Sequence, residues 1–139
     1  MIRILSLCLF LSIFGVVWAD RPTPIEEKPG QPAVVDHPVH HIVLCWLKEP
    51  GNMKHRKHLI KASKMLKEIP EVLDVRVGTV IQSERDIVDD SFDVGIVMTF
   101  ASTEAMERYL VHPEHTEKVR TVLGPLCKKI LVYDFLAED

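Results

Sequence analysis

A tyrosine and two histidines lie close together around a proline: Tyr109, His112 and His115 on either side of Pro113. Proline has no backbone N–H and a fixed φ, so Pro113 suits the first turn of a helix and ends the helix before it. Tyr109 then closes one helix and His115 lies in the opening turn of the next. This geometry can turn a phenol and an imidazole toward the same space.

These residue types can carry acid–base chemistry on a carbonyl compound. A neutral histidine near its intrinsic pKa takes a proton from a carbon beside a carbonyl at physiological pH. A tyrosine hydroxyl holds that histidine or donates to the developing enolate oxygen. The alternative is structural: Tyr109 packs in the core and His112 and His115 cap a helix.

The elements that must position these residues can be read from the hydrophobic pattern. Residues 40–47 and 72–81 read as strands, and residues 52–69 have a helical period with Leu59, Ala62, Leu66 and Ile69 on one stripe. Gly78 predicts a bulge or a close approach in the second strand. A polar loop over 83–91 leads to a third strand over 92–100, in which Phe92 alternates with Val94.

Ser102 is a good N-cap for the helix that carries Tyr109. The helix after Pro113 runs to Gly124-Pro125, and residues 127–136 form the last strand. The order β-α-β-β-α-β predicts an α+β, ferredoxin-like fold. Two helices cover only one face of a four-stranded sheet, so we expect the apolar set Ile42, Leu44 and Trp46, or its opposite set, to pack against a second copy.

The N-terminal region predicts export. A short positive start, Met1 to Arg3, precedes the apolar run from Ile4 to Val17, and Val17-Trp18-Ala19 fits a cleavage site. The run is shorter than a membrane-spanning helix needs. We therefore expect a signal peptide at 1–19, a proline-rich tether at 20–38, one folded domain at 39–137, and a secreted or periplasmic protein without stable membrane insertion.

Charge and composition limit the classes of partner that the chain is expected to bind. Removing Arg3 with the signal takes the formal charge from −3 to −4, which gives no indication of nucleic acid binding. His55 and His58 have a spacing that suits metal, but flanking lysines oppose a cation, so no metal site is expected. The lysines of the first helix read as a solvated surface. No haem or flavin signature is present, and no cofactor is expected.

Two cysteines remain after the signal, Cys45 on the first strand and Cys127 at the start of the last. In the ferredoxin-like topology these strands are antiparallel neighbours, so we expect the two thiols to be close. An oxidising compartment permits a disulfide, but its geometry cannot be read from sequence. A bond and two buried thiols both remain open.

Four segments together resemble the stress-responsive dimeric α/β-barrel (Dabb) family. They are His40-His41-Ile42-Val43-Leu44, Ile69-Pro70-Glu71-Val72, Phe100-Ala101-Ser102-Thr103-Glu104-Ala105-Met106 and Tyr109-Leu110-Val111-His112-Pro113-Glu114-His115. The resemblance covers nearly the whole folded part, and it implies a homodimer built through the sheets.

The resemblance also implies roles for single residues. One plant member, a polyketide cyclase that makes olivetolic acid, places its catalytic tyrosine and histidine where this chain has Tyr109 and His115, and a further pocket histidine where this chain has His41. Another pocket histidine of that enzyme is replaced near Val94. His112 is a further candidate for ligand binding.

Three functions stay open at this point. The first is an exported homodimeric module that is stress-related or binds a small apolar or aromatic ligand without a reaction. The second is a cyclase or isomerase that uses His/Tyr acid–base chemistry. The third is a monooxygenase or haem-binding relative. An open space between His41, Tyr109 and His115 favours the second, and a filled interior favours the first.

Overall fold

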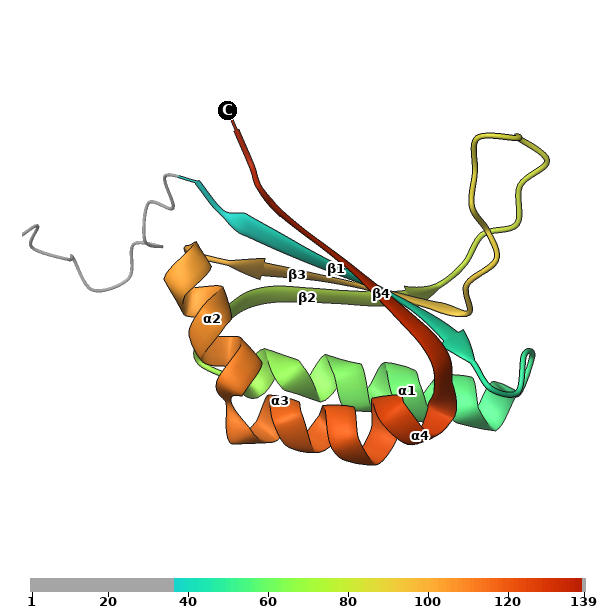
Figure 1. Cartoon of the computed structure of the whole chain (residues 1–139), viewed down its shortest axis with the longest axis horizontal. Helices are drawn as coiled ribbons and strands as arrows, with labels where there is room; N and C mark the ends of the chain where they lie inside the picture. Colours follow the sequence, from blue (N-terminus) through green and yellow to red (C-terminus); the bar gives the residue numbers. More distant parts are fainter. Residues whose placement is uncertain (1–36, 139) are drawn as a thin grey trace, which may run out of the picture. The chain divides into compact units, whose positions relative to one another are not determined.

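The computed structural model describes residues 37–138 (Figure 1). The predicted signal peptide and nearly all of the predicted tether lie outside the described residues. No helix within 37–138 is both long enough and apolar enough to cross a membrane.

The described chain forms a four-stranded antiparallel sheet with helices between its strands. The elements are β1 (Val39–Leu47), α1 (Met53–Met65), β2 (Val72–Thr79), β3 (Val94–Phe100), α2 (Thr103–Val111), α3 (Pro113–Lys118), α4 (Gly124–Leu126) and β4 (Cys127–Leu136). A 3₁₀ turn (Leu66–Glu68) extends α1, and a π turn (Val119–Leu123) joins α3 to α4. The sheet order is β2-β3-β1-β4. The predicted ferredoxin-like βαββαβ fold is confirmed.

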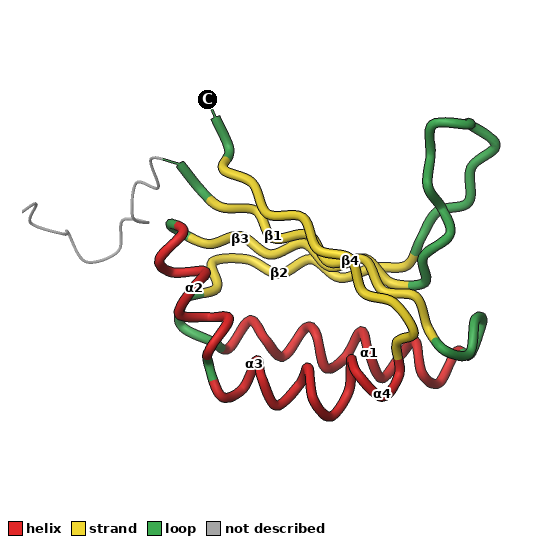
Figure 2. Tube along the Cα trace, viewed as in Figure 1, coloured by secondary structure: helices red, strands yellow, loops and turns green. Residues whose placement is uncertain are grey.

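All the helices lie on one side of the sheet, and the core fills the space between the two layers (Figures 1 and 2). Successive residues of a strand point to opposite faces. On β1 the face toward the helices therefore carries Val43, Cys45 and Leu47, all buried. The predicted stripe of the first helix, from Leu59 to Ile69, meets this face as part of the same buried cluster.

The helices begin where local chemistry favours it. The Asn52 side chain accepts hydrogen bonds from the backbone N–H groups of Lys54 and His55, and Ser102 accepts one from Ala105. These contacts satisfy N–H groups that have no partner inside the helix. Pro113 takes the first position of α3, as predicted.

Two details differ from the sequence-based expectation. β3 begins at Val94, and Phe92 lies before it, edge-on to Trp46 with ring centroids 6.3 Å apart, instead of continuing the core face. Gly78 marks neither a bulge nor a close approach, because it pairs regularly with Gly95 and a Cβ there would meet no atom within 4 Å. The register shift of β2 lies between Val72 and Asp74 instead.

The helical chain also continues past Gly124-Pro125 to Leu126. In the π turn the Gly124 N–H donates to the carbonyl of Val119. A new short turn then begins, and Pro125 lies near its start, where a missing N–H costs little.

The outer face of the sheet, turned away from the helices, is partly apolar and has no covering layer within residues 37–138. Ile42 and Leu44 are half-buried, while Val97, Tyr133 and Phe135 are exposed. Trp46 differs from its neighbours, because the chain itself buries it: Phe92 packs against its ring and the Lys129 ammonium lies 4.1 Å from the ring centroid.

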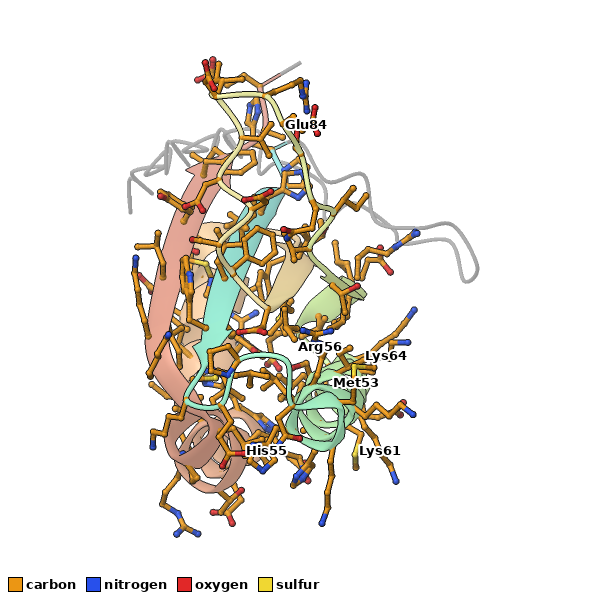
Figure 3. All side chains as sticks on the ribbon, turned by 90° about the vertical axis from the view of Figure 1, so that its right-hand side faces the viewer. Met53, His55, Arg56, Lys61, Lys64 and Glu84 are labelled. Atoms are coloured by element: carbon orange, nitrogen blue, oxygen red, sulfur yellow. The ribbon has the colours of Figure 1, made fainter. Side chains whose placement is uncertain are left out.

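The lysines of α1 lie on its solvent side, as predicted. Figure 3 shows Lys61 extending away from the sheet, whereas Arg56 lies on the side of α1 nearer the sheet. There the Arg56 guanidinium is 3.2 Å from the buried carboxylate of Asp93.

Candidate functional site

His41 lies on the helix-facing side of β1 and is only 5% exposed. Its Nδ1 is 2.6 Å from Oδ1 of Asp134, which lies directly opposite it on β4. An ionised carboxylate only accepts hydrogen bonds, so Nδ1–H is the donor in this pair. The Nε2 atom is thereby left available on the other side of the ring.

Tyr109 lies in the last turn of α2 and is 1% exposed. Its ring centroid is 4.9 Å from that of Phe100 and 6.1 Å from that of His41. Burial raises the pKa of the Tyr109 hydroxyl above its ordinary value, so the group stays protonated. The hydroxyl makes no hydrogen bond to any group in residues 37–138. Tyr109 therefore has a proton to donate and no acceptor for it among residues 37–138.

His115 packs against Tyr109 from the opening turn of α3, with ring centroids 4.4 Å apart and the ring planes tilted by 39°. Its Nδ1 lies 2.9 Å from the carbonyl oxygen of Leu110. A carbonyl cannot donate, so Nδ1 carries the hydrogen and Nε2 of the neutral ring is a free acceptor. Burial lowers the pKa of His115, and the nearby His41 and His112 lower it further, against the opposing effect of the Leu110 carbonyl.

The structure thus brings together His41, Tyr109 and His115, three of the four residues predicted for the site. His112 has a different position. Its Nδ1 accepts a hydrogen bond of 3.2 Å from the backbone N–H of Glu114 and caps α3. A role of His112 in ligand binding stays a prediction, but the contact that the structure gives it is structural.

Asp134 is the site residue that sequence reasoning missed. Its signal was one acidic side chain within the otherwise apolar run Ile130–Phe135 of an edge strand. Pairing of Asp134 with His41 depends on the register of β1 against β4, which the sequence does not reveal.

The strand that carries Asp134 also supplies an open apolar wall. Ile130 and Val132 lie opposite Cys45 and Val43, so they share the helix-facing side of the sheet with His41. Ile130 is nevertheless 39% exposed and Val132 43% exposed. The helices pack mainly against β2 and β3, which leaves these two side chains uncovered. The polar cluster is therefore continuous with apolar surface that a ligand can contact.

The lowered pKa of His115 makes a testable contribution to stability. Because the folded pKa lies below the ordinary 6.5, the unfolded chain binds the proton more readily. The contribution is therefore fully present above about pH 6.5 and is lost as the pH falls toward the folded pKa. Between pH 7 and pH 5 we expect the free energy of unfolding to fall less in the His115→Asn variant than in the parent protein. Urea unfolding at a series of pH values measures this, and parallel curves for the two proteins would contradict it.

Within residues 37–138 no cluster of three or more histidine, cysteine or acidic side chains has the arrangement of a metal site. His55 lies 3.8 Å from Glu49, and nothing in this pair adds a third ligand. The chemistry that the arrangement supports is hydrogen bonding and proton transfer by the phenol of Tyr109 and the two imidazole Nε2 atoms.

The fold and the site define a class: a small ferredoxin-like domain with a His/Tyr cluster between its sheet and its helices. Residues 39–137 match the family described as "Stress responsive A/B Barrel Domain", Dabb. The chain belongs to this family.

Solved structures of other proteins have the same fold. A Dabb family protein of Mesorhizobium loti is 27% identical, with 74% of this chain and 99% of that chain covered and a TM-score of 0.62. The protein At3g17210 of Arabidopsis thaliana is 25% identical, with coverages of 73% and 96% and a TM-score of 0.62. A dimeric ferredoxin-like protein of Thermobifida fusca is 18% identical, with coverages of 73% and 92% and a TM-score of 0.59. No curated protein matches the chain.

Proposed function

We propose that this chain is a homodimeric binding protein for a small apolar or aromatic compound that carries a carbonyl or hydroxyl group. The observation that carries the proposal is the polar cluster itself: within residues 37–138 neither the hydroxyl of Tyr109 nor the Nε2 atom of His41 or His115 has a hydrogen-bond partner. These polar groups, with the exposed Ile130 and Val132 on the same side of the sheet as His41, fit a ligand with one polar end and an apolar body.

The homodimer is supported by the outer face of the sheet. Ile42 and Leu44, with exposed Val97, Tyr133 and Phe135, form an apolar surface on the side away from the helices. A contiguous apolar patch marks an interface, and a second copy covers it by two-fold symmetry. Ferredoxin-like proteins of Thermobifida fusca, Bacteroides fragilis and a Jannaschia species are described as dimeric, which supports the same arrangement here.

Export is the third part of the proposal. It is supported by the positive start, the apolar run over 4–17 and the small residues at 17 and 19. Sequencing the N-terminus of the protein recovered from the medium or the periplasm tests it: Asp20 as the first residue agrees with export, and an intact Met1 contradicts cleavage.

Acid–base catalysis is the second candidate function, and the state of His115 favours it. Its lowered pKa keeps the ring neutral at pH 7, and its Nε2 is a free proton acceptor. This atom can accept a proton from a carbon beside a carbonyl, while the Tyr109 hydroxyl donates to the enolate oxygen. A cyclisation or an isomerisation begins with such a step.

A ligand screen tests the binding proposal. Small aromatic, polyketide-like and aliphatic carbonyl compounds are added to the full chain and the thermal melt is followed. A true ligand at 100 times its Kd stabilises the fold by about 2.7 kcal/mol, so a hit gives a saturable rise in Tm. Exchange of hydrogen for deuterium beside the carbonyl, followed by NMR, then separates catalysis from binding. A library in which no compound shifts the melt would contradict the proposal.

A further inference from the structure

Two cysteines meet where β1 ends and β4 begins. The register of the two strands shifts between Trp46 and Leu47, so that Leu47 lies opposite Cys127. Leu47 and Cys45 lie on the same face of β1, and Cys127 therefore joins Cys45 on the helix-facing side. Both side chains are buried, Cys45 completely and Cys127 to all but 7%. Each thiol is the largest cause of the shift in the other's pKa, so the two thiols lie within interaction distance, as expected from the proximity of the two strands.

We propose that Cys45 and Cys127 are a cross-linking site, closed into an intrachain disulfide by exchange with a low-molecular-weight disulfide such as oxidised glutathione. This inference stands apart from the ligand proposal, because neither thiol belongs to the His/Tyr cluster.

The surroundings of the two sulfur atoms decide which one reacts first. The interaction with Cys45 lowers the pKa of Cys127, and the nearby Lys48 ammonium lowers it further, while burial and Asp93 oppose this. The interaction with Cys127 and burial raise the pKa of Cys45 far above its ordinary value. The thiolate is the nucleophile in exchange, so Cys127 attacks and Cys45 resolves.

The exchange balances in two steps. The Cys127 thiolate attacks one sulfur of the small disulfide, whose S–S bond breaks, and one small thiolate leaves. Cys45 then gives up its proton and attacks the Cys127 sulfur, and the second small thiolate leaves. The two cysteines are oxidised and one small disulfide is reduced to two thiols.

The closed form ties β1 to β4, the two strands that carry His41 and Asp134. β4 is an edge strand, and it carries Asp134, the partner of His41. A disulfide that closes a long loop restricts the unfolded chain more than one that closes a short loop. We expect the oxidised protein to melt at a higher temperature than the reduced protein.

The experiment uses the full chain with Cys8→Ser, so that only Cys45 and Cys127 carry thiols. Native protein is incubated with oxidised glutathione, quenched with acid, and analysed by intact mass and by thiol counting in denaturant. The expected product has lost two hydrogen atoms and both free thiols, and its Tm is raised. Lys48→Met should slow the reaction several-fold at pH 7 and less at pH 9. Lys128→Met, which changes a lysine on the same strand as Cys127, should leave the rate unchanged.

Two single-cysteine variants test which thiol attacks first. Cys45→Ser should stop at the mixed disulfide on Cys127, and Cys127→Ser should react much more slowly at Cys45. Two free thiols after long incubation of the folded parent would overturn the proposal. So would a parent that accumulates the mixed disulfide without closing it.

Discussion

Replacing Ile42 with aspartate is expected to turn a dimer into folded monomers. Ile42 lies on the outer face of β1, away from the core, so its replacement leaves the packing between sheet and helices intact. In the proposed dimer each copy loses about 1.5–3 kcal/mol of apolar burial and places a carboxylate in the interface at a cost of several kcal/mol. Two-fold symmetry applies both costs twice. The dissociation constant should rise at least about a thousandfold, equivalent to about 4 kcal/mol.

Light scattering at micromolar concentration measures this, and the parent is expected at twice the monomer mass. Lys57→Asp is the matched control, because it introduces the same side chain on exposed α1, on the opposite side of the sheet. The control should stay dimeric. A parent that is monomeric at micromolar concentration, or an Ile42→Asp variant that stays dimeric, would rule out this interface.

The comparison of sequence with structure shows which parts of the fold are local. The strands, the helices and the cap at Ser102 follow from periodicity and side-chain chemistry within a few residues. The proximity of Cys45 and Cys127 followed from topology, because ferredoxin-like folds place their first and last strands side by side. These features need no knowledge of the three-dimensional register.

The predictions that were wrong, and the site residue that was not predicted, depend on contacts between distant segments. Phe92 has the spacing of a core residue, but it precedes the strand and packs on Trp46 instead. Gly78 reads as an irregularity in sequence and proves to be a regular pair with Gly95. Asp134 reveals its role only in the register that places it opposite His41.

In the candidate site too, the features set by nearby residues were predictable and those set by distant contacts were not. Pro113 and the helix break predict that Tyr109 and His115 approach each other, and their ring centroids lie 4.4 Å apart. The capping bond of His112 also follows from its position before Pro113. The exposed apolar wall formed by Ile130 and Val132 could not be predicted, because it depends on which strands the helices leave uncovered.

Tyr109→Phe is expected to weaken ligand binding without changing the stability of the fold. The Tyr109 hydroxyl makes no bond within residues 37–138, while the ring packs on Phe100 and His115, and phenylalanine keeps that ring. Loss of a hydrogen bond costs about 0.5–1.5 kcal/mol, which corresponds to an affinity loss of up to about tenfold. Titration of the variant with a hit from the screen, beside a thermal melt, measures both quantities.

Asp134→Asn extends the test to His41. It keeps the size of the side chain but replaces a charged acceptor by an amide, which can also donate to Nδ1, so the ring hydrogen of His41 is no longer held on Nδ1. Because Asp134 is partly exposed, we expect a small change in Tm and a clear loss of affinity. His41→Ala is a poorer probe, since it removes a buried ring and should lower stability as well.

His112→Ala is expected to lower stability without changing affinity, the opposite of Tyr109→Phe, so the two variants together distinguish a binding role from a structural one. Its loss removes the bond to the Glu114 N–H at the start of α3, which should lower stability by about 0.5–1 kcal/mol and leave affinity unchanged. A hydroxyl that serves the fold would make Tyr109→Phe behave like His112→Ala, with a lowered Tm and full binding. If both variants fall in Tm and neither changes affinity, the cluster is structural. If affinity alone falls in Tyr109→Phe and Tm alone falls in His112→Ala, the unpaired hydroxyl belongs to the ligand.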